Sequence, residues 1–132
     1  MAPFSRNQPS ATLLIHELTD PRGKGIVEVK EEDANSYQVL SVQEKPEKPK
    51  TKLAIEPVHI FQPEFFEDLA ETKPGDRGEI QITDAMERMI REGMQVLATG
   101  LLEDEIRLNV GDSESYWQAL SASHRLIPMR GI

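Results

Sequence analysis

Short apolar runs separated by turn residues organise this chain. Residues 12–15 form a nearly continuous apolar run, typical of a strand covered on both faces, and we expect that strand to span Ala11 to Leu18. The runs from Ile26 to Val29 and from Tyr37 to Val42 flank an acidic turn, so they predict a β-hairpin. Residues 44–52 hold two prolines and four lysines, which indicates a loop because proline cannot donate to a sheet.

The second half of the pattern alternates between strand-like and helix-like segments. Leu53 to Phe61 is a further apolar run, and Pro63 to Glu71 has the character of a short helix with proline near its start. A longer helix follows, for which Thr83 is the predicted N-cap and Gly93 the end. The predicted apolar face of this helix consists of Ala85, Met86, Met89 and Ile90. After the helix we expect strands at Gln95–Leu101 and Glu105–Val110, and then a final helix capped by Asp112 or Ser113. This alternation predicts an α/β fold with a sheet covered by helices.

Length and charge narrow the class of protein. The 132 residues fit one domain, which we expect at residues 11–132 after a polar tail at residues 1–10. A net charge of −8 argues against nonspecific binding to nucleic acid or to anionic membranes, because both select a basic face. No apolar run has the length of a membrane span, and the first ten residues lack the features of a signal peptide. The absence of cysteine fits a reducing compartment, and cytoplasm is the expected location.

Three short polar motifs are candidates for binding chemistry. Glu44-Lys45-Pro46 places a carboxylate that can bind hydroxyls beside an ammonium that can neutralise a phosphate. Arg77-Gly78-Glu79 offers a guanidinium for phosphate, and Asn109-Val110-Gly111-Asp112 is a polar segment at a predicted strand-to-helix junction. Taken singly, each motif is better explained as an ordinary loop, turn or cap.

The order of the motifs changes that interpretation. Five segments follow one another along the chain: Gly25-Ile26-Val27, Glu44-Lys45-Pro46, Leu53-Ala54-Ile55, the run from Arg77 to Asp84, and Asn109-Val110-Gly111. In this order and spacing they resemble the second half of the sugar-1-phosphate nucleotidyltransferases, such as glucose-1-phosphate thymidylyltransferase and uridylyltransferase. The resemblance covers residues 11–124.

The resemblance implies part of a Rossmann-like nucleotidyltransferase fold, with a mixed sheet flanked by helices and the nucleotide-binding half absent. In that family a sugar-1-phosphate oxygen attacks the α-phosphorus of a nucleoside triphosphate and pyrophosphate leaves, with Mg²⁺ present in a complete enzyme. Carried over to this chain, Gly25 approaches the sugar through its backbone and Glu44 binds sugar hydroxyls. Lys45 and Arg77 hold the sugar phosphate, and Ile55 lines the sugar pocket.

Departures from the family pattern are equally informative. Nothing in the chain resembles the glycine-rich triphosphate loop or the first metal-binding aspartate. Asn109 occupies the position of the second metal aspartate and is a weaker ligand for Mg²⁺. Pro57 and His59 replace a glycine and a tyrosine beside the sugar, and Lys24 replaces a tyrosine before Gly25. We therefore assign no catalytic and no metal-binding residue to this chain, and expect no cofactor to be bound by it alone.

Three explanations for the missing half remain open at this point. The chain is a truncated product, a subunit completed by a separate nucleotide-binding polypeptide, or a repurposed module that self-associates or senses nucleotide sugars. The expected ligand is a sugar-1-phosphate or a nucleotide-sugar. A homo-oligomer is expected because removing half of a shared sheet exposes an apolar strand edge or face.

Overall fold

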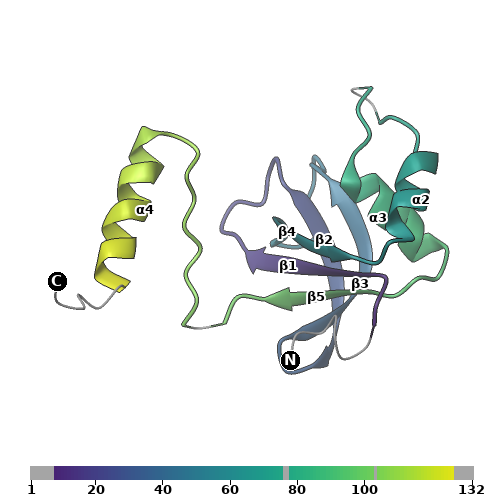
Figure 1. Cartoon of the computed structure of the whole chain (residues 1–132), viewed down its shortest axis with the longest axis horizontal. Helices are drawn as coiled ribbons and strands as arrows, with labels where there is room; N and C mark the ends of the chain where they lie inside the picture. The colour runs from purple at the N-terminus through teal and green to yellow at the C-terminus, as the bar shows by residue number, and fades with distance from the viewer. Residues whose placement is uncertain (1–7, 76–77, 103, 127–132) are drawn as a thin grey trace. The chain divides into compact units, whose positions relative to one another are not determined.

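A computed structural model describes residues 8–75, 78–102 and 104–126. The chain divides into two compact units, Met1–Leu102 and Glu103–Ile132 (Figure 1). Residues 1–7 of the predicted tail lie outside the described residues. Just after them, the Ser10 N–H donates to the carbonyl oxygen of Gln95 at 2.9 Å, which ties this part of the chain to the first unit.

The first unit is built on a mixed sheet, as predicted. Its strands are β1 (Ala11–Glu17), β2 (Gly25–Asp33), β3 (Ser36–Glu44), β4 (Leu53–Phe61) and β5 (Val96–Gly100). They lie in the order β1-β4-β2-β3-β5, and β5 pairs in parallel with β1, so the sheet closes into a barrel. The other pairings are antiparallel. The prediction of an α/β fold with a mixed sheet flanked by helices is confirmed.

The β2–β3 hairpin turns at a residue in the left-handed region. Asn35 has φ of +55°, a conformation that asparagine tolerates better than most residues. Its side chain also reaches β5, where Nδ2 donates to the Gly100 carbonyl oxygen at 2.9 Å and Oδ1 accepts from the Gly100 N–H at 3.0 Å. These bonds hold the turn of the hairpin against β5. The opposite, open end of the hairpin is where Gly25 and Glu44 are paired.

Two helices pack against the sheet through its main apolar cluster. They are α2 (Phe65–Glu71) and α3 (Ile82–Arg91). Three of the four residues predicted for the apolar face of α3 are buried, and Ile90 packs against the cluster. The buried members of the cluster are Ala11, Leu13, Ile15, Val27, Val39, Val42, Phe65, Ala85, Met86, Met89, Val96 and Ala98. The helical spacing of the apolar residues of α3, which the sequence predicted, is therefore confirmed.

The ends of α3 partly differ from the prediction. The helix begins at Ile82, and Gln81 is the N-cap without a side-chain capping bond, so the assignment of Thr83 as the cap is wrong. The physical reason is that the Thr83 hydroxyl bonds elsewhere, as described below. Gly93 has φ of +84° and ends the helix as predicted, with its N–H donating to the Ile90 carbonyl oxygen at 3.0 Å.

The second unit contains α4 (Ser113–Leu126). Asp112 caps it as predicted, because its Oδ1 accepts from the Ser115 N–H at 2.8 Å, and this contact lowers the pKa of the Asp112 carboxyl.

The predicted strand at Glu105–Val110 is wrong, since residues 105–110 form no strand. Its alternating apolar side chains at Ile106 and Leu108 are exposed and find no strand to pair with among the described residues. No described helix is long and apolar enough to cross a membrane.

We expect Met86→Ala to lower the free energy of unfolding by about 2–5 kcal/mol, because Met86 is fully buried between α3 and the sheet and truncation leaves a cavity. Leu40→Ala is the matched control, since Leu40 is half exposed on β3, and we expect it to cost about 1 kcal/mol or less. Urea denaturation of both variants measures the difference. Equal losses would contradict this placement of the core.

Candidate functional site

The open end of the β2–β3 hairpin brings two of the predicted residues together. Gly25 and Glu44 are directly paired across the hairpin, so they lie side by side. Lys45 follows at once, with φ of +42°, and its N–H donates to the Lys24 carbonyl oxygen at 3.1 Å. A non-glycine residue rarely adopts this left-handed conformation, and such residues cluster at functional sites.

The Glu44 carboxylate is held by two partners. Its Oε2 accepts a hydrogen bond from the Thr83 hydroxyl at 2.9 Å, and its Oε1 lies 3.4 Å from Lys45 Nζ. The Glu44 side chain is 25% exposed, so the carboxylate is fixed and still reachable from solvent. A carboxylate oriented in this way can accept hydrogen bonds from a hydroxylated ligand, with a cation beside it for an anionic group.

The side chains of Thr83, Glu44 and Ile55 lie close to the Cα of Gly25 and leave little space for a side chain there. A Cβ at that position would lie 3.2 Å from Thr83 Cγ2, 3.4 Å from Glu44 Oε2 and 3.5 Å from Ile55 Cδ1. These distances also place Ile55 of β4 at the cluster, whereas its contact with a sugar stays a prediction. The first unit therefore gathers Gly25, Glu44 and Ile55 from three strands, Lys45 from just after β3, and Thr83 from the first turn of α3.

Two predicted residues are not part of this described cluster. Arg77 lies outside the described residues, so its contact with phosphate stays a prediction. Asn109 belongs to the second unit, in the segment before α4, and its Nδ2 lies 3.3 Å from where a Cβ of Gly111 would stand. Across the described ranges, no three His, Asp or Glu side chains are grouped to hold a metal ion.

Two histidines have surroundings that the sequence did not reveal. His16 Nδ1 lies 3.7 Å from Oε1 of Glu56, a buried carboxylate on β4, because strand pairing brings these distant positions together. The rings of His59 and Phe61 lie with their centroids 5.7 Å apart, and partial burial lowers the pKa of the His59 imidazole, which favours the neutral form at pH 7. The partners of these two histidines, Glu56 and Phe61, lie outside the cluster around Glu44, so we leave both out of the candidate site.

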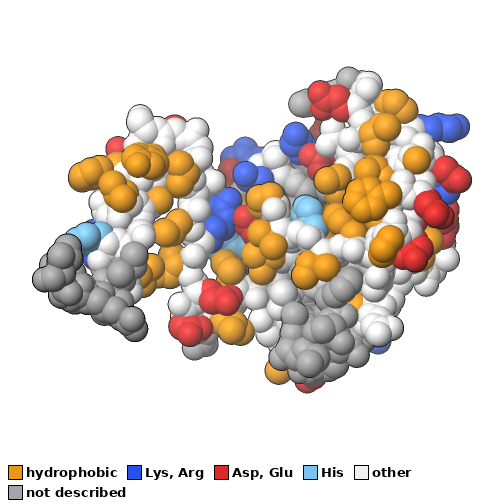
Figure 2. Space-filling model, viewed as in Figure 1, with side chains coloured by type: hydrophobic (Ala, Val, Ile, Leu, Met, Phe, Trp, Pro, Cys, Tyr) orange, Lys and Arg blue, Asp and Glu red, His pale blue; other side chains and the backbone are white. Residues whose placement is uncertain are grey.

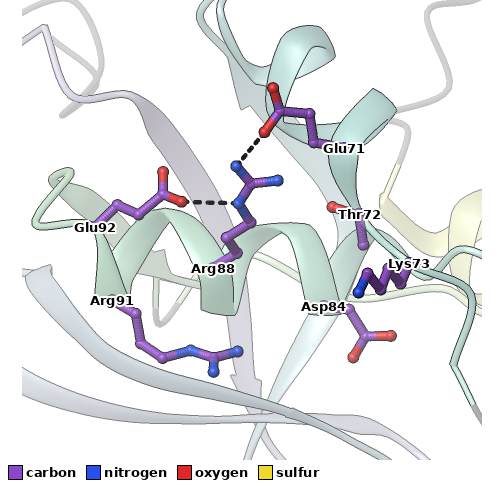
Figure 3. A pocket seen from close by; sticks show the side chains of 7 residues that line it. All are labelled: Glu71, Thr72, Lys73, Asp84, Arg88, Arg91 and Glu92. Atoms are coloured by element: carbon purple, nitrogen blue, oxygen red, sulfur yellow. Dashed lines mark hydrogen bonds and ion pairs between the residues drawn. The ribbon is translucent and has the colours of Figure 1, made fainter.

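A separate pocket of about 520 Å³ lies between the end of α2 and α3 (Figure 3). It is lined by Glu71, Thr72, Lys73, Asp84, Arg88, Arg91 and Glu92. Arg88 donates to carboxylates on both sides, to Glu71 and to Glu92, and these contacts raise the pKa of its guanidinium. Three cations thus face three carboxylates. The residues that carry the family resemblance, Gly25, Glu44 and Lys45, lie at the hairpin and not in this pocket, so we place the candidate site at Glu44.

Thr83 is the site residue that sequence reasoning missed. It precedes a helical stretch and has the side chain of a cap, so local pattern favoured a capping role. The available signal was its place beside Asp84 in the run of residues 77–84 that carried the family resemblance. Only the packing of α3 against the hairpin shows that its hydroxyl turns to Glu44.

Comparison with known proteins gives consistent matches. The family model described as Nucleotidyl transferase matches residues 3–125. The glucose-1-phosphate thymidylyltransferase of Streptomyces griseus is 38% identical over 96 residues, which cover 73% of this chain and 26% of that protein. The corresponding enzyme of Streptomyces antibioticus is 33% identical over 67% of this chain and 24% of its own length. The chain therefore spans about a quarter of these curated relatives.

Solved structures give the same picture at the level of the fold. A crystal structure of UDP-glucose pyrophosphorylase complexed with UDP-glucose superposes with a TM-score of 0.81 at 28% identity. The match covers 92% of this chain and 46% of that chain. Most of the present chain thus has a counterpart in that fold, and about half of that fold has none here.

We expect Gly25→Ala to lower the free energy of unfolding by about 1–3 kcal/mol, because the new methyl group must displace the Thr83 methyl group. Thr83→Ser removes that methyl group and keeps the hydroxyl that bonds Glu44. Gly25→Ala should then cost clearly less in the Thr83→Ser background than in the wild type. A double-mutant cycle by urea denaturation measures this coupling, and strict additivity would show that the two residues do not touch.

Proposed function

We propose that this chain, which belongs to the nucleotidyl transferase family, binds the sugar-1-phosphate in the transfer of a nucleotide to that sugar. The observation that carries the proposal is the arrangement of Glu44, which Thr83 and Lys45 hold beside Gly25 at the end of the β2–β3 hairpin. The relatives support it, because their names specify glucose-1-phosphate or UDP-glucose.

Each side chain has a distinct part in the proposed complex. Glu44 is acceptor-only when ionised, so it selects a ligand that offers hydroxyl donors. Gly25 would let its backbone approach the sugar, and Ile55, whose Cδ1 lies close to Gly25, would supply an apolar wall of the sugar pocket. Lys45 places an ammonium next to the carboxylate, where it can pair with phosphate. Arg77 is proposed as a second phosphate ligand from the loop before α3.

In the proposed reaction the bound sugar phosphate is the nucleophile. One of its phosphate oxygens attacks the α-phosphorus of a nucleoside triphosphate, and the bond to the β-phosphate breaks with release of pyrophosphate. This chain contributes positioning of the nucleophile and neutralisation of its charge, since repulsion between two anions opposes their approach.

The described residues do not fit the Mg²⁺ ion that the family reaction implies. Divalent magnesium selects carboxylates and phosphates, whereas Asn109 offers a neutral amide, and the described part of the chain holds no group of three carboxylate or histidine ligands. We derive no step through a metal on this chain. The nucleotide and its metal are therefore proposed to be held by residues beyond the candidate site.

Two readings of the cellular role follow. In the first, which we favour, the chain acts in the cytoplasm as the sugar-phosphate half of a transferase completed by nucleotide-binding residues. In the second, it is a non-catalytic module that self-associates or senses nucleotide sugars. Asn109 at the metal position favours the second reading, and the preserved contacts of Glu44 favour the first.

The chain alone is expected to release no pyrophosphate from a nucleoside triphosphate and glucose-1-phosphate, because it lacks a triphosphate loop and carries Asn109. A coupled pyrophosphate assay with each nucleoside triphosphate measures this. Activity in the wild type that disappears in Lys45→Ala would contradict the prediction. Activity unchanged in Lys45→Ala would indicate a contaminating enzyme.

Binding of glucose-1-phosphate is expected to depend on Lys45 and Arg77, since a charge-assisted hydrogen bond contributes about 1.5–3 kcal/mol. Lys45→Ala and Arg77→Ala should each weaken binding about tenfold or more, and Arg77→Lys should recover only part. Glu44→Gln should alter preference among sugar phosphates more than affinity for inorganic phosphate. Calorimetric titration measures these effects.

Lys48→Ala is the matched control for this titration, because Lys48 is an exposed lysine of the same loop. It should leave the affinity unchanged. A wild type that binds neither glucose-1-phosphate nor inorganic phosphate at millimolar concentration would overturn the proposed function. An Arg77→Ala variant that binds as tightly as wild type would remove Arg77 alone from the site.

A further inference from the structure

Helix α3 lies against the later part of strand β3, where β3 has no described strand on the side away from β2. β3 pairs with β2 along its length, and it pairs with β5 near its start, at Tyr37 and Gln38. Further along, β3 contacts α3, and Val42 belongs to the buried cluster that α3 completes. A backbone N–H at such a covered edge needs a partner, because a buried donor without one is costly.

The N–H of Val42 takes its partner from α3. It donates to Oε2 of Glu87 at 2.7 Å, a short bond from a backbone donor to a carboxylate. The Lys45 N–H donates to the Lys24 carbonyl oxygen just before β2. N–H groups two residues apart in a strand point the same way, so the Gln43 N–H faces β2 and the Val42 N–H faces away from it. Glu87 thus supplies the acceptor that a neighbouring strand would otherwise supply.

Glu87 differs in this respect from the exposed acidic side chains of the two helices. Figure 2 shows acidic side chains at the surface where α2 and α3 lie, and Glu67, Glu71 and Glu92 are exposed. The Glu87 side chain is only 29% exposed, and its second oxygen, Oε1, lies 3.9 Å from Nε of Arg91, one turn further along α3. One oxygen of this carboxylate therefore contacts the sheet, and the other lies near a cation of its own helix.

Two polar contacts one helical turn apart therefore dock α3 on β3. Thr83 and Glu87 are four residues apart, so they lie on one side of α3. Their partners, Glu44 and Val42, are two residues apart on β3. The N-cap residue Gln81 makes no side-chain capping bond, so the position of the first turn depends on these contacts and on core packing. Sliding or rotation of the helix would break at least one of the two contacts.

We propose that Glu87 is a positioning residue, which orients the Glu44 carboxylate for the sugar by fixing the place of Thr83 along β3. This proposal rests on the proposed function. Without the Glu87 contact, α3 can shift along β3, and the Thr83 hydroxyl no longer holds Oε2 of Glu44. The carboxylate can then turn to the ammonium of Lys45, whose Nζ already lies 3.4 Å from Oε1. Its orientation toward a sugar hydroxyl is lost, whereas the ammonium beside the phosphate stays in place.

Amide hydrogen exchange followed by NMR tests the contact itself. Glu87→Ala should speed exchange at Val42 by about tenfold or more, because the Val42 N–H loses its acceptor. Exchange at Gln43, whose N–H faces β2, should change less. Equal acceleration at both residues would show a general loss of stability and overturn the proposal, as would unchanged exchange at Val42.

Calorimetric titration with glucose-1-phosphate and with inorganic phosphate tests the effect on the site. Glu87→Ala should lower the ratio of the two affinities by about threefold or more, the scale of one hydrogen bond, whereas a loss of stability alone would leave this ratio unchanged. Glu87→Gln keeps an acceptor oxygen for the Val42 N–H and should retain most of the ratio. In a Thr83→Ala background, Glu87→Ala should lower the ratio no further, because Glu87 acts through the Thr83 hydroxyl.

Glu92→Ala is the matched control, since Glu92 is an exposed carboxylate at the end of α3 that accepts from Arg88, and it should leave the ratio unchanged. The proposal is overturned if Glu87→Ala keeps the wild-type ratio, if Glu87→Gln loses as much as Glu87→Ala, if the substitutions at positions 83 and 87 are additive, or if Glu92→Ala lowers the ratio equally. A wild type that binds neither ligand would overturn the proposed function instead, and exchange at Val42 would still decide whether Glu87 docks α3.

Discussion

The candidate site depends on one constraint, the register of the β2–β3 hairpin. That register places Gly25 directly opposite Glu44, and a shift by one residue would turn the Glu44 side chain to the other face of the sheet. The Asn35 turn and its bonds to Gly100 hold the register at the far end of the hairpin. The geometry of the carboxylate is therefore set by backbone pairing before any ligand arrives.

Helix α3 adds a second constraint on the Glu44 carboxylate, a hydrogen bond from the Thr83 hydroxyl. Its apolar residues pack into the core, and that packing fixes the first turn of the helix, where Thr83 donates to Glu44. Core packing and polar geometry are coupled in this way, because moving α3 would also move the hydroxyl. The close approach of Gly25 to the Thr83 methyl group explains why that position carries a glycine.

Charge in this protein acts over short distances. The chain carries −8, so an anionic ligand is repelled at long range and must be held by cations placed next to it. Lys45 is the cation proposed for this role, and its ammonium lies beside the Glu44 carboxylate. In the pocket between α2 and α3, by contrast, Arg88 is already engaged by two carboxylates. The same residue types are thus proposed to bind a ligand in one place and make structural contacts in the other.

The sequence by itself determined the elements whose signal is local, such as the apolar run of β1, the apolar face of α3, the Gly93 end and the Asp112 cap. Tertiary structure decided which groups form hydrogen bonds with each other, because the partner of a hydroxyl or of a strand edge can be distant in sequence and is brought near only by the fold. Thr83 has the side chain of a cap and turns instead to Glu44, 39 residues away. Residues 105–110 alternate in polarity as a strand does but form no strand, since a strand requires a neighbouring strand that local pattern does not supply.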